Sequence, residues 1–211
     1  MTIKVGIIDY GMGNLRSVSN AVLAISAEPD YVTDPEKLYA FDRLILPGVG
    51  AFPDAIKRLR ETGMDQALDE QRKSGKPILG LCLGMQLMCS ESEEGGYSQG
   101  LCWFDATVKR FPDRLGLKMP HIGWNNLLLA QDHPLFRDVD STPDVYFVHS
   151  FRVECGDQKD VLAWCDYGEP FAAVIGRKNI FGMQFHPEKS QRAGLAMLRN
   201  FVGEEICLKS V

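Results

Sequence analysis

The most informative stretch of the chain is residues 78–86, with the sequence ILGLCLGMQ. It begins with an apolar run of the kind that forms buried parallel strands. A single cysteine, Cys82, follows between glycines at positions 80 and 84, and a helix-like run starts directly after it. This order predicts a nucleophile elbow, a tight strand-to-helix turn that requires small neighbours and lifts its central side chain above the sheet. The helix N-terminus would favour the thiolate form of Cys82, whereas a cysteine buried only for packing is the alternative.

Strands and helices alternate on both sides of this stretch in the first half of the chain. Apolar runs predict strands over residues 3–8, 28–33, 44–46 and 78–81. Apolar residues at helical spacing predict helices that begin near Leu15, Phe52 and Met64, the first of them capped by Asn14. Such alternation is typical of an α/β fold with three layers, in which helices cover both faces of a mostly parallel sheet. Sites in these folds lie beyond the carboxyl ends of the strands.

Short runs rich in β-branched and aromatic residues dominate the second half of the chain. They span residues 103–111, 123–130, 145–153, 161–165, 171–175 and 180–185. Because turns separate them, they predict an antiparallel or mixed β portion. We expect the polar residues 91–99 to form a loop and residues 191–203 to form a last helix. Since no repeat or linker interrupts the pattern, we expect a single domain over residues 1–211.

Length, composition and charge restrict the classes of function. The chain has 211 residues, of which 45% are hydrophobic and 24% charged, as in ordinary globular proteins. Its net charge of −5 provides no global basic field for nucleic acid or an anionic membrane. The first residues lack the pattern of an export signal, and no apolar run approaches the ~18 residues that span a bilayer. We therefore expect a cytoplasmic protein.

Cysteine and glycine spacing predicts neither a metal nor a cofactor. The cysteines stand at positions 82, 89, 102, 155, 165 and 207 without a CxxC pair, so we expect free thiols rather than a zinc or redox motif. Gly11 and Gly13 lack the third glycine of a dinucleotide fingerprint, because Arg16 occupies its position.

A cysteine nucleophile needs a base, and one of the histidines has a suitable setting. His186 follows an apolar run and precedes Pro187 and Glu188. Pro187 restricts His186 to extended backbone, and the carboxylate of Glu188 is near enough along the chain to orient the imidazole. We expect His121 and His133 to be core or surface residues, with His133 solvated.

The third part of the predicted site is the stretch PGVG at residues 47–50. A carbonyl attacked by Cys82 develops negative charge, which backbone N–H donors must stabilise. Leu83 supplies one candidate N–H, and Val49 or Gly50 supplies the second. The glycines allow this loop to approach closely and to reorient, although an ordinary strand-to-helix turn would contain the same residues.

Cys82 in its elbow, followed later by His186, Pro187 and Glu188, resembles the class I (triad) glutamine amidotransferases. Within that class, the chain is similar to the glutaminase subunits of imidazole glycerol phosphate synthase, and the resemblance covers essentially its whole length. The segments that carry this similarity are DYGMGN at 9–14, PGVGAF at 47–52, HIGWN at 121–125, YFVHS at 146–150 and FHPEKS at 185–190.

The resemblance implies that Cys82 attacks the side-chain amide of glutamine, with His186 as the base and Glu188 orienting it. Glutamate and ammonia would form through a thioester at Cys82. The resemblance also implies that Leu83 and Val49 or Gly50 hold the oxyanion. The implied glutamine-binding residues are Gly50, Gln86, Glu94, His149 and Ser150.

The same resemblance implies a partner, a (β/α)8-barrel cyclase that receives the ammonia in a heterodimer and forms imidazole glycerol phosphate in histidine biosynthesis. Asn14, Trp124 and Lys189 would lie at the interface. Two other hypotheses stay open. One is another stand-alone triad amidotransferase or γ-glutamyl hydrolase, which needs no cyclase. The other is a non-catalytic scaffold, which would have no need for a complete triad.

Overall fold

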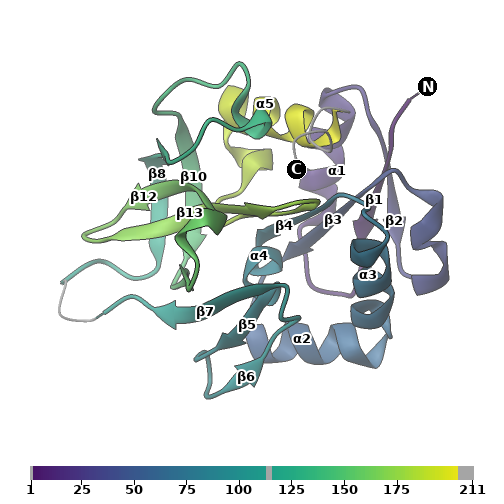
Figure 1. The fold of residues 1–211 in the computed structure, drawn as a ribbon, viewed down its shortest axis with the longest axis horizontal. Coiled ribbons are helices and arrows are strands. Elements are labelled where there is room, and N and C mark those ends of the chain that lie inside the picture. The colour runs from purple at the N-terminus through teal and green to yellow at the C-terminus, as the bar shows by residue number, and fades with distance from the viewer. Residues whose placement is uncertain (1, 113–115, 204–211) are drawn as a thin grey trace.

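A computed structural model of the protein describes residues 2–112 and 116–203 (Figure 1). The elements of the first half are β1 (Lys4–Ile8), α1 (Leu15–Ala24), β2 (Glu28–Val32), η1 (Pro35–Ala40), β3 (Arg43–Gly48), α2 (Phe52–Glu61), α3 (Met64–Lys73), β4 (Ile78–Cys82), α4 (Leu83–Leu87), β5 (Cys89–Ser92), β6 (Ser98–Gln99) and β7 (Phe104–Arg110). Those of the second half are β8 (His121–Asn126), β9 (Leu128–Leu129), η3 (Pro134–Phe136), β10 (Asp144–His149), β11 (Phe151–Cys155), η4 (Gln158–Asp160), β12 (Val161–Asp166), β13 (Pro170–Arg177), β14 (Ile180–Met183), η5 (Pro187–Lys189) and α5 (Gln191–Val202).

The large central sheet has the strand order β2-β1-β3-β4-β14-β13-β11-β7-β5-β6. The strands from β2 to β14 in this order pair in parallel, and β13 and β11 continue the sheet in antiparallel pairing. The predicted α/β fold with a mostly parallel centre and an antiparallel second portion is therefore confirmed. The pairing of β14 with β4 is important for the site, because it places the residues that follow β14 next to the strand that ends at Cys82.

Helices cover both faces of the parallel strands because successive strand residues point to opposite faces. Along β3, Ile45 packs into the same core cluster as residues of α1 and α5, whereas Leu44 and Leu46 pack with residues of α2 and α3. Figure 1 shows α1 and α5 together on one side of the sheet and α2 and α3 on the other. The continuous apolar runs of these strands follow from this double burial.

Two expectations about the second half are corrected. Residues 91–99 are not wholly a loop, because β5 and β6 form a short antiparallel pair at its ends. The run 145–153 is not one strand, because it breaks at Ser150 into β10, which pairs with β8 in a separate small sheet, and β11, which belongs to the large sheet. The break turns the residues around Ser150 toward the carboxyl ends of β3 and β4, where they line one pocket with Val49 and Cys82.

Smaller corrections concern two polar side chains. Asn14 occupies the N-cap position of α1, but its side chain makes no capping hydrogen bond. His133 is half-buried rather than solvated. Its Nδ1 accepts the N–H of Leu135 at 3.1 Å, and its ring centroid lies 5.6 Å from that of Phe181. This local hydrogen bond starts η3.

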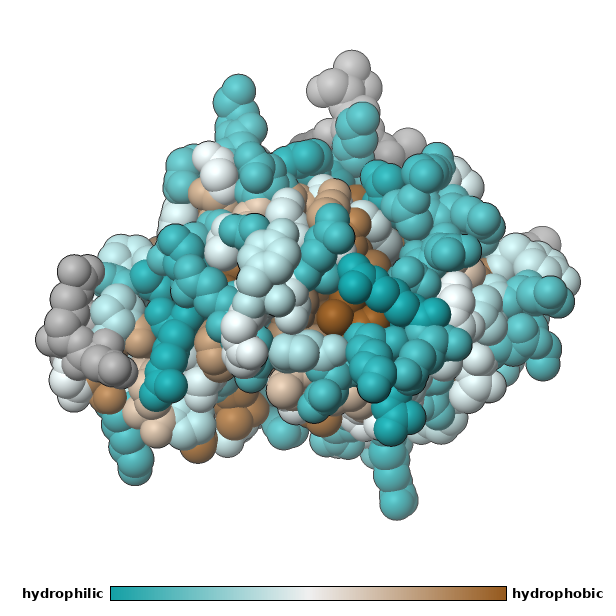
Figure 2. Space-filling view, turned by 90° about the horizontal axis from the view of Figure 1, so that it is seen from below, coloured by the Kyte–Doolittle hydropathy of each residue, from teal (hydrophilic) through white to brown (hydrophobic). Residues whose placement is uncertain are grey.

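On the face drawn in Figure 2, hydrophilic side chains predominate and hydrophobic ones form small patches. Among the helices of the described residues, none is both long and apolar enough to cross a bilayer.

Candidate active site

Cys82 stands at the junction of β4 and α4 with a backbone conformation that few non-glycine residues adopt. Its φ is 52° and its ψ is −110°, a sparsely populated region that costs free energy and is found mainly at functional sites. The predicted elbow is therefore present. The strain is maintained because β4 and α4 are both fully packed on either side of the turn.

The flanking glycines are required by close backbone approach. A Cβ added at Gly84 would lie 1.8 Å from the backbone oxygen of Leu46, and one added at Gly80 would lie 2.6 Å from the backbone carbon of Gly84. No side chain fits at such distances without moving β3 or α4. The spacing of glycines two residues before and after Cys82 thus has a steric cause.

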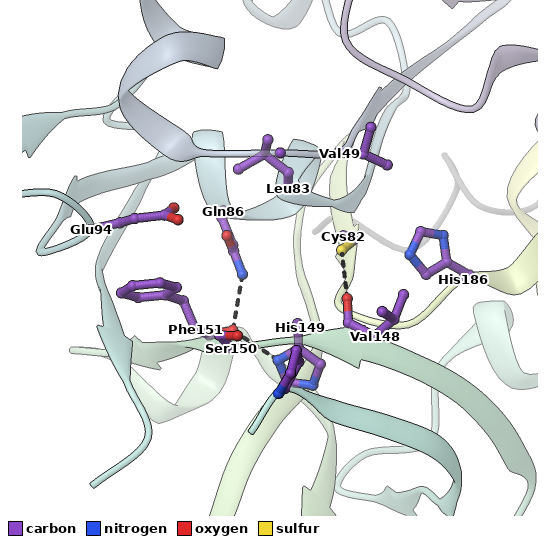
Figure 3. Close-up of a pocket in the computed structure, with 12 residues that line it drawn as sticks. Val49, Cys82, Leu83, Gln86, Glu94, Val148, His149, Ser150, Phe151 and His186 are labelled. Atoms are coloured by element: carbon purple, nitrogen blue, oxygen red, sulfur yellow. Dashed lines mark hydrogen bonds between the residues drawn. The ribbon is translucent and has the colours of Figure 1, made fainter. Parts of the chain in front are cut away.

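His186 reaches Cys82 because β14 runs parallel to β4, with Met183 opposite Leu81. The chain leaving β14 therefore emerges at the same sheet edge as the elbow, and both side chains line one pocket (Figure 3). The Nδ1 of His186 lies 2.8 Å from Oε1 of Glu188 in η5. Because the carboxylate occupies Nδ1, Nε2 is the ring nitrogen that is available to accept the proton of Cys82.

The electrostatics of His186 favour its charged form. Burial alone would lower its pKa, but the interactions with Cys82 and with the carboxylate of Glu188 outweigh burial and raise the pKa to about 9. The imidazole can therefore take up a thiol proton and hold it beside a thiolate. The structure brings the three predicted triad residues together.

The loop after β3 borders the same pocket. Gly48 lies opposite Cys82 in the parallel register of β3 and β4, and Gly50 adopts a φ of 98°, which favours glycine. Val49, Gly50 and Leu83 all line the pocket. The Oη of Tyr10 donates a hydrogen bond of 3.0 Å to the carbonyl of Pro47 and so fixes the base of this loop.

The pocket has a volume of about 330 Å³, which suits a small polar molecule. It includes every residue for which the sequence predicts glutamine binding, although their contact with glutamine remains a prediction. The lining residues are Val49, Gly50, Cys82, Leu83, Gln86, Glu94, Pro120, Val148, His149, Ser150, Phe151 and His186.

The imidazole of His149 is fully engaged inside the protein. Its Nδ1 lies 2.8 Å from the carbonyl oxygen of Phe151, which can only accept, so Nδ1 carries the proton. Its Nε2 lies 3.1 Å from Nδ1 of His121 and must accept from it. Burial lowers the pKa of His149 to about 3 and that of His121 to about 4, so both rings are neutral. Both ring nitrogens of His149 are therefore used in hydrogen bonds within the protein.

Sequence reasoning missed two residues of this region. Phe151 lines the pocket and offers its carbonyl to both Gln86 and His149. Gln184 is fully buried directly after β14, with its amide 3.8 Å from the sulfur of Cys82. The signal for Gln184 was available, since it is the one polar residue in the apolar run of residues 180–185.

Two of the three predicted interface residues contact the same ring, and the third lies beside the predicted triad. Trp124 is 47% exposed, and its ring centroid lies 5.9 Å from that of Tyr146. The Nζ of Lys189 lies 5.8 Å from the same Tyr146 ring. Asn14 lines a small cavity together with Glu188. Contact with a partner remains a prediction for all three.

The other described cysteines have settings unlike that of Cys82. Burial raises the pKa of Cys89 well above its ordinary value and raises the pKa of Cys155 and Cys165 to about 12. Cys102 is exposed, and the described cysteines are free thiols. Cys207 lies outside the described residues. In the described ranges, no group of three or more His, Cys, Asp or Glu side chains is placed to hold a metal ion.

Comparison with known proteins agrees with this geometry. Residues 6–204 match the family described as glutamine amidotransferase class-I. The imidazole glycerol phosphate synthase subunit HisH of Methanosarcina barkeri is 48% identical, over 94% of this chain and 98% of the relative. The chain belongs to the HisH family of class I glutamine amidotransferases. The HisH protein of Symbiobacterium thermophilum is 46% identical, over 97% of this chain and 95% of the relative.

Solved structures support the class I amidotransferase fold of this HisH family member. A glutamine amidotransferase from Thermotoga maritima superposes with a TM-score of 0.70 at 16% identity, covering 98% of this chain and 99% of that one. PurLQS from the same organism gives a TM-score of 0.75 at 18% identity, covering 96% and 98%. At these identities the likeness concerns the fold alone.

Proposed function

We propose that this HisH family member is the glutaminase subunit of imidazole glycerol phosphate synthase and hydrolyses L-glutamine to glutamate and ammonia. The observation that carries the proposal is the juxtaposition, in one pocket, of a strained cysteine and a histidine held by a buried glutamate. Backbone strain at a thiol brings no benefit to a binding module, whereas in an enzyme it directs the nucleophile into the pocket.

The chemistry begins with transfer of the Cys82 thiol proton to Nε2 of His186. The sulfur then adds to the side-chain carbonyl carbon of glutamine, and the carbonyl oxygen becomes an oxyanion held by the N–H of Leu83 and one N–H of Val49 or Gly50. The imidazolium returns its proton to the departing nitrogen as the carbon–nitrogen bond breaks, releasing ammonia and leaving a thioester. Water, deprotonated by His186, hydrolyses the thioester to glutamate and free thiol.

Polar groups around the pocket suit the zwitterionic end of glutamine. Glu94 is anchored because its Oε2 accepts the N–H of Phe52 at 2.8 Å, and its carboxylate charge complements an α-ammonium group. Gln86 is buried with both its amide protons used inside the protein, which leaves its oxygen as an acceptor. We propose that these two groups, with Gly50 and the main chain of His149 and Ser150, bind the substrate.

The family name describes one component of a larger enzyme, and a chain that makes ammonia needs a consumer for it. We propose a heterodimer with a (β/α)8-barrel cyclase, which uses the ammonia to form imidazole glycerol phosphate in histidine biosynthesis. Asn14, Trp124 and Lys189 would form part of the contact. We also propose that residues 1–211 act as a single amidotransferase domain and that the protein works in the cytoplasm.

The test is glutamate release by Cys82→Ala, with Cys89→Ala as the matched control. Cys89 is a fully buried free thiol nearby, so its variant reproduces the loss of a core sulfur without touching the pocket. We expect no turnover from Cys82→Ala and near-normal turnover from Cys89→Ala, both assayed with the cyclase and its nucleotide ligand. Substantial turnover by Cys82→Ala would overturn the mechanism. Equal rates with and without the cyclase would favour a stand-alone amidotransferase or γ-glutamyl hydrolase.

A further inference from the structure

A chain of hydrogen bonds runs behind the pocket from a backbone carbonyl to the sulfur of Cys82. The Nε2 of Gln86 donates to the oxygen of Phe151 at 3.0 Å and to Oε1 of Gln184 at 2.9 Å. The Nε2 of Gln184 in turn points at Sγ of Cys82 at 3.8 Å. Gln184 does not line the pocket, so it acts on the reaction only through Gln86 and Cys82.

The direction of every bond in this chain is fixed by its first member. A carbonyl oxygen can only accept, so the group of Gln86 that meets Phe151 must be its NH₂. The second proton of that NH₂ then goes to Gln184, whose side-chain oxygen must be the atom that receives it. Gln184 is left with its own NH₂ toward the sulfur. Figure 3 shows the Gln86 nitrogen directed at Phe151 and its oxygen directed away.

We infer that Gln184 is a positioning residue that presents an N–H donor to the Cys82 sulfur and holds the Gln86 amide with its oxygen available to the substrate. An N–H donor stabilises a thiolate more than a neutral thiol, because hydrogen bonds to charged acceptors are stronger. Gln184 is fully buried, so water cannot take its place on removal. The second part of this role, at Gln86, rests on the proposed function, whereas the first does not.

The titratable groups around Cys82 lie on other parts of the chain. His186, held by Glu188, immediately precedes η5. Tyr10 follows β1 and is a neutral phenol, because burial raises its pKa. His149 on β10 is neutral, because burial and, to a smaller extent, the nearby charge of His186 lower its pKa. Gln184 differs from these groups because it is uncharged at every pH, so it shifts the titration of the site without adding a titration of its own.

Two variants separate the two bonds. Gln184→Met keeps the length of the side chain and loses both bonds, whereas Gln184→Glu keeps an acceptor for Gln86 and places a carboxylate where the sulfur had a donor. Iodoacetamide alkylation of Cys82, followed by mass spectrometry across pH, reads the thiolate directly and needs no glutamine. We expect the midpoint of the alkylation profile to rise by about one pH unit in Gln184→Met, as loss of one weak charge-assisted bond implies, and by more in Gln184→Glu. The KM for glutamine should rise severalfold in Gln184→Met and stay within about twofold in Gln184→Glu.

The matched control is Asn179→Ala, at the opposite end of β14. Its side-chain amide donates to the carbonyls of Arg72 and Lys76, so the variant loses comparable bonds far from the thiol. We expect lower stability but an unchanged alkylation midpoint. Unchanged midpoints in both folded Gln184 variants would overturn the inference, even if Cys82→Ala proved the nucleophile. Should both variants fail to fold, the wild-type side-chain amide resonance of Gln184 provides the test: it must move as Cys82 titrates, and a stationary resonance would overturn the inference.

Discussion

Substituting Gly84 by alanine should damage the elbow and the activity together. The added Cβ would lie 1.8 Å from the oxygen of Leu46, where a carbon and an oxygen need roughly 3.3 Å. Relief therefore requires β3 and α4 to separate by about 1.5 Å, next to Cys82 and the loop that follows β3. Overpacking of this degree costs about 3 kcal/mol, and a displacement on the order of 1 Å at reacting groups lowers kcat/KM on the order of 100-fold.

Urea unfolding and glutaminase assays of Gly84→Ala measure the two effects. Gly203→Ala is the matched control, because its Cβ would meet its nearest atom, the Arg199 oxygen, at an ordinary 3.4 Å. We expect that control to change the free energy of unfolding by less than about 0.5 kcal/mol. A Gly84→Ala protein with wild-type stability and kcat/KM would refute the steric account of the elbow.

Two further predictions concern the histidines. In Glu188→Gln the carboxylate no longer offsets the effect of burial on His186, so the pKa of His186 should fall from about 9. The value of kcat/KM should drop on the order of 100-fold or more, and an unchanged NMR titration of the His186 ring would contradict this reasoning. Burial lowers the pKa of His149 to about 3 and of His121 to about 4, so between about pH 6.5 and 4 the unfolded chain binds protons that the folded chain does not, and stability is lost as the pH falls. Each of these two histidines lowers the free energy of unfolding by up to about 2 kcal/mol as the pH falls from 6.5 to 5. The raised pKa of His186 has the opposite effect: its stabilisation is fully present below about pH 6.5 and is lost as the pH rises through about 9. Urea unfolding at pH 7 and pH 5 should therefore differ by about 2–4 kcal/mol, and equal values would refute the neutral buried pair.

The parallel half of the fold could be predicted from sequence because double burial leaves continuous apolar runs that end at turns. The hairpin of β5 and β6 could not, since residues such as Ser90 and Glu91 show no apolar alternation and their pairing depends on neighbouring β7. The break at Ser150 was also hidden, because the residues on both sides of it are equally apolar and only the tertiary structure assigns them to different sheets.

At the site, Cys82, His186 and Glu188 could be predicted because local spacing and parallel strand ends determine their positions. Roles that depend on hydrogen-bond direction could not. His149 was expected to bind glutamine, yet only the structure shows that Phe151 and His121 occupy both its ring nitrogens. Gln184 was overlooked inside an apolar run, because its function depends on the orientation of a neighbouring amide.

Covalent labelling tests the central claim most directly, namely that Cys82 is the nucleophile that opens the glutamine amide. The protein, in complex with the cyclase, is treated with a diazoketone analogue of glutamine, digested and mapped by mass spectrometry. We predict one adduct per chain, on Cys82, and complete loss of glutaminase activity when it forms. Added glutamine should slow formation of the adduct, and so should the substitution Glu188→Gln. Inactivation without an adduct on Cys82, or an adduct on another cysteine such as Cys102, would contradict the account.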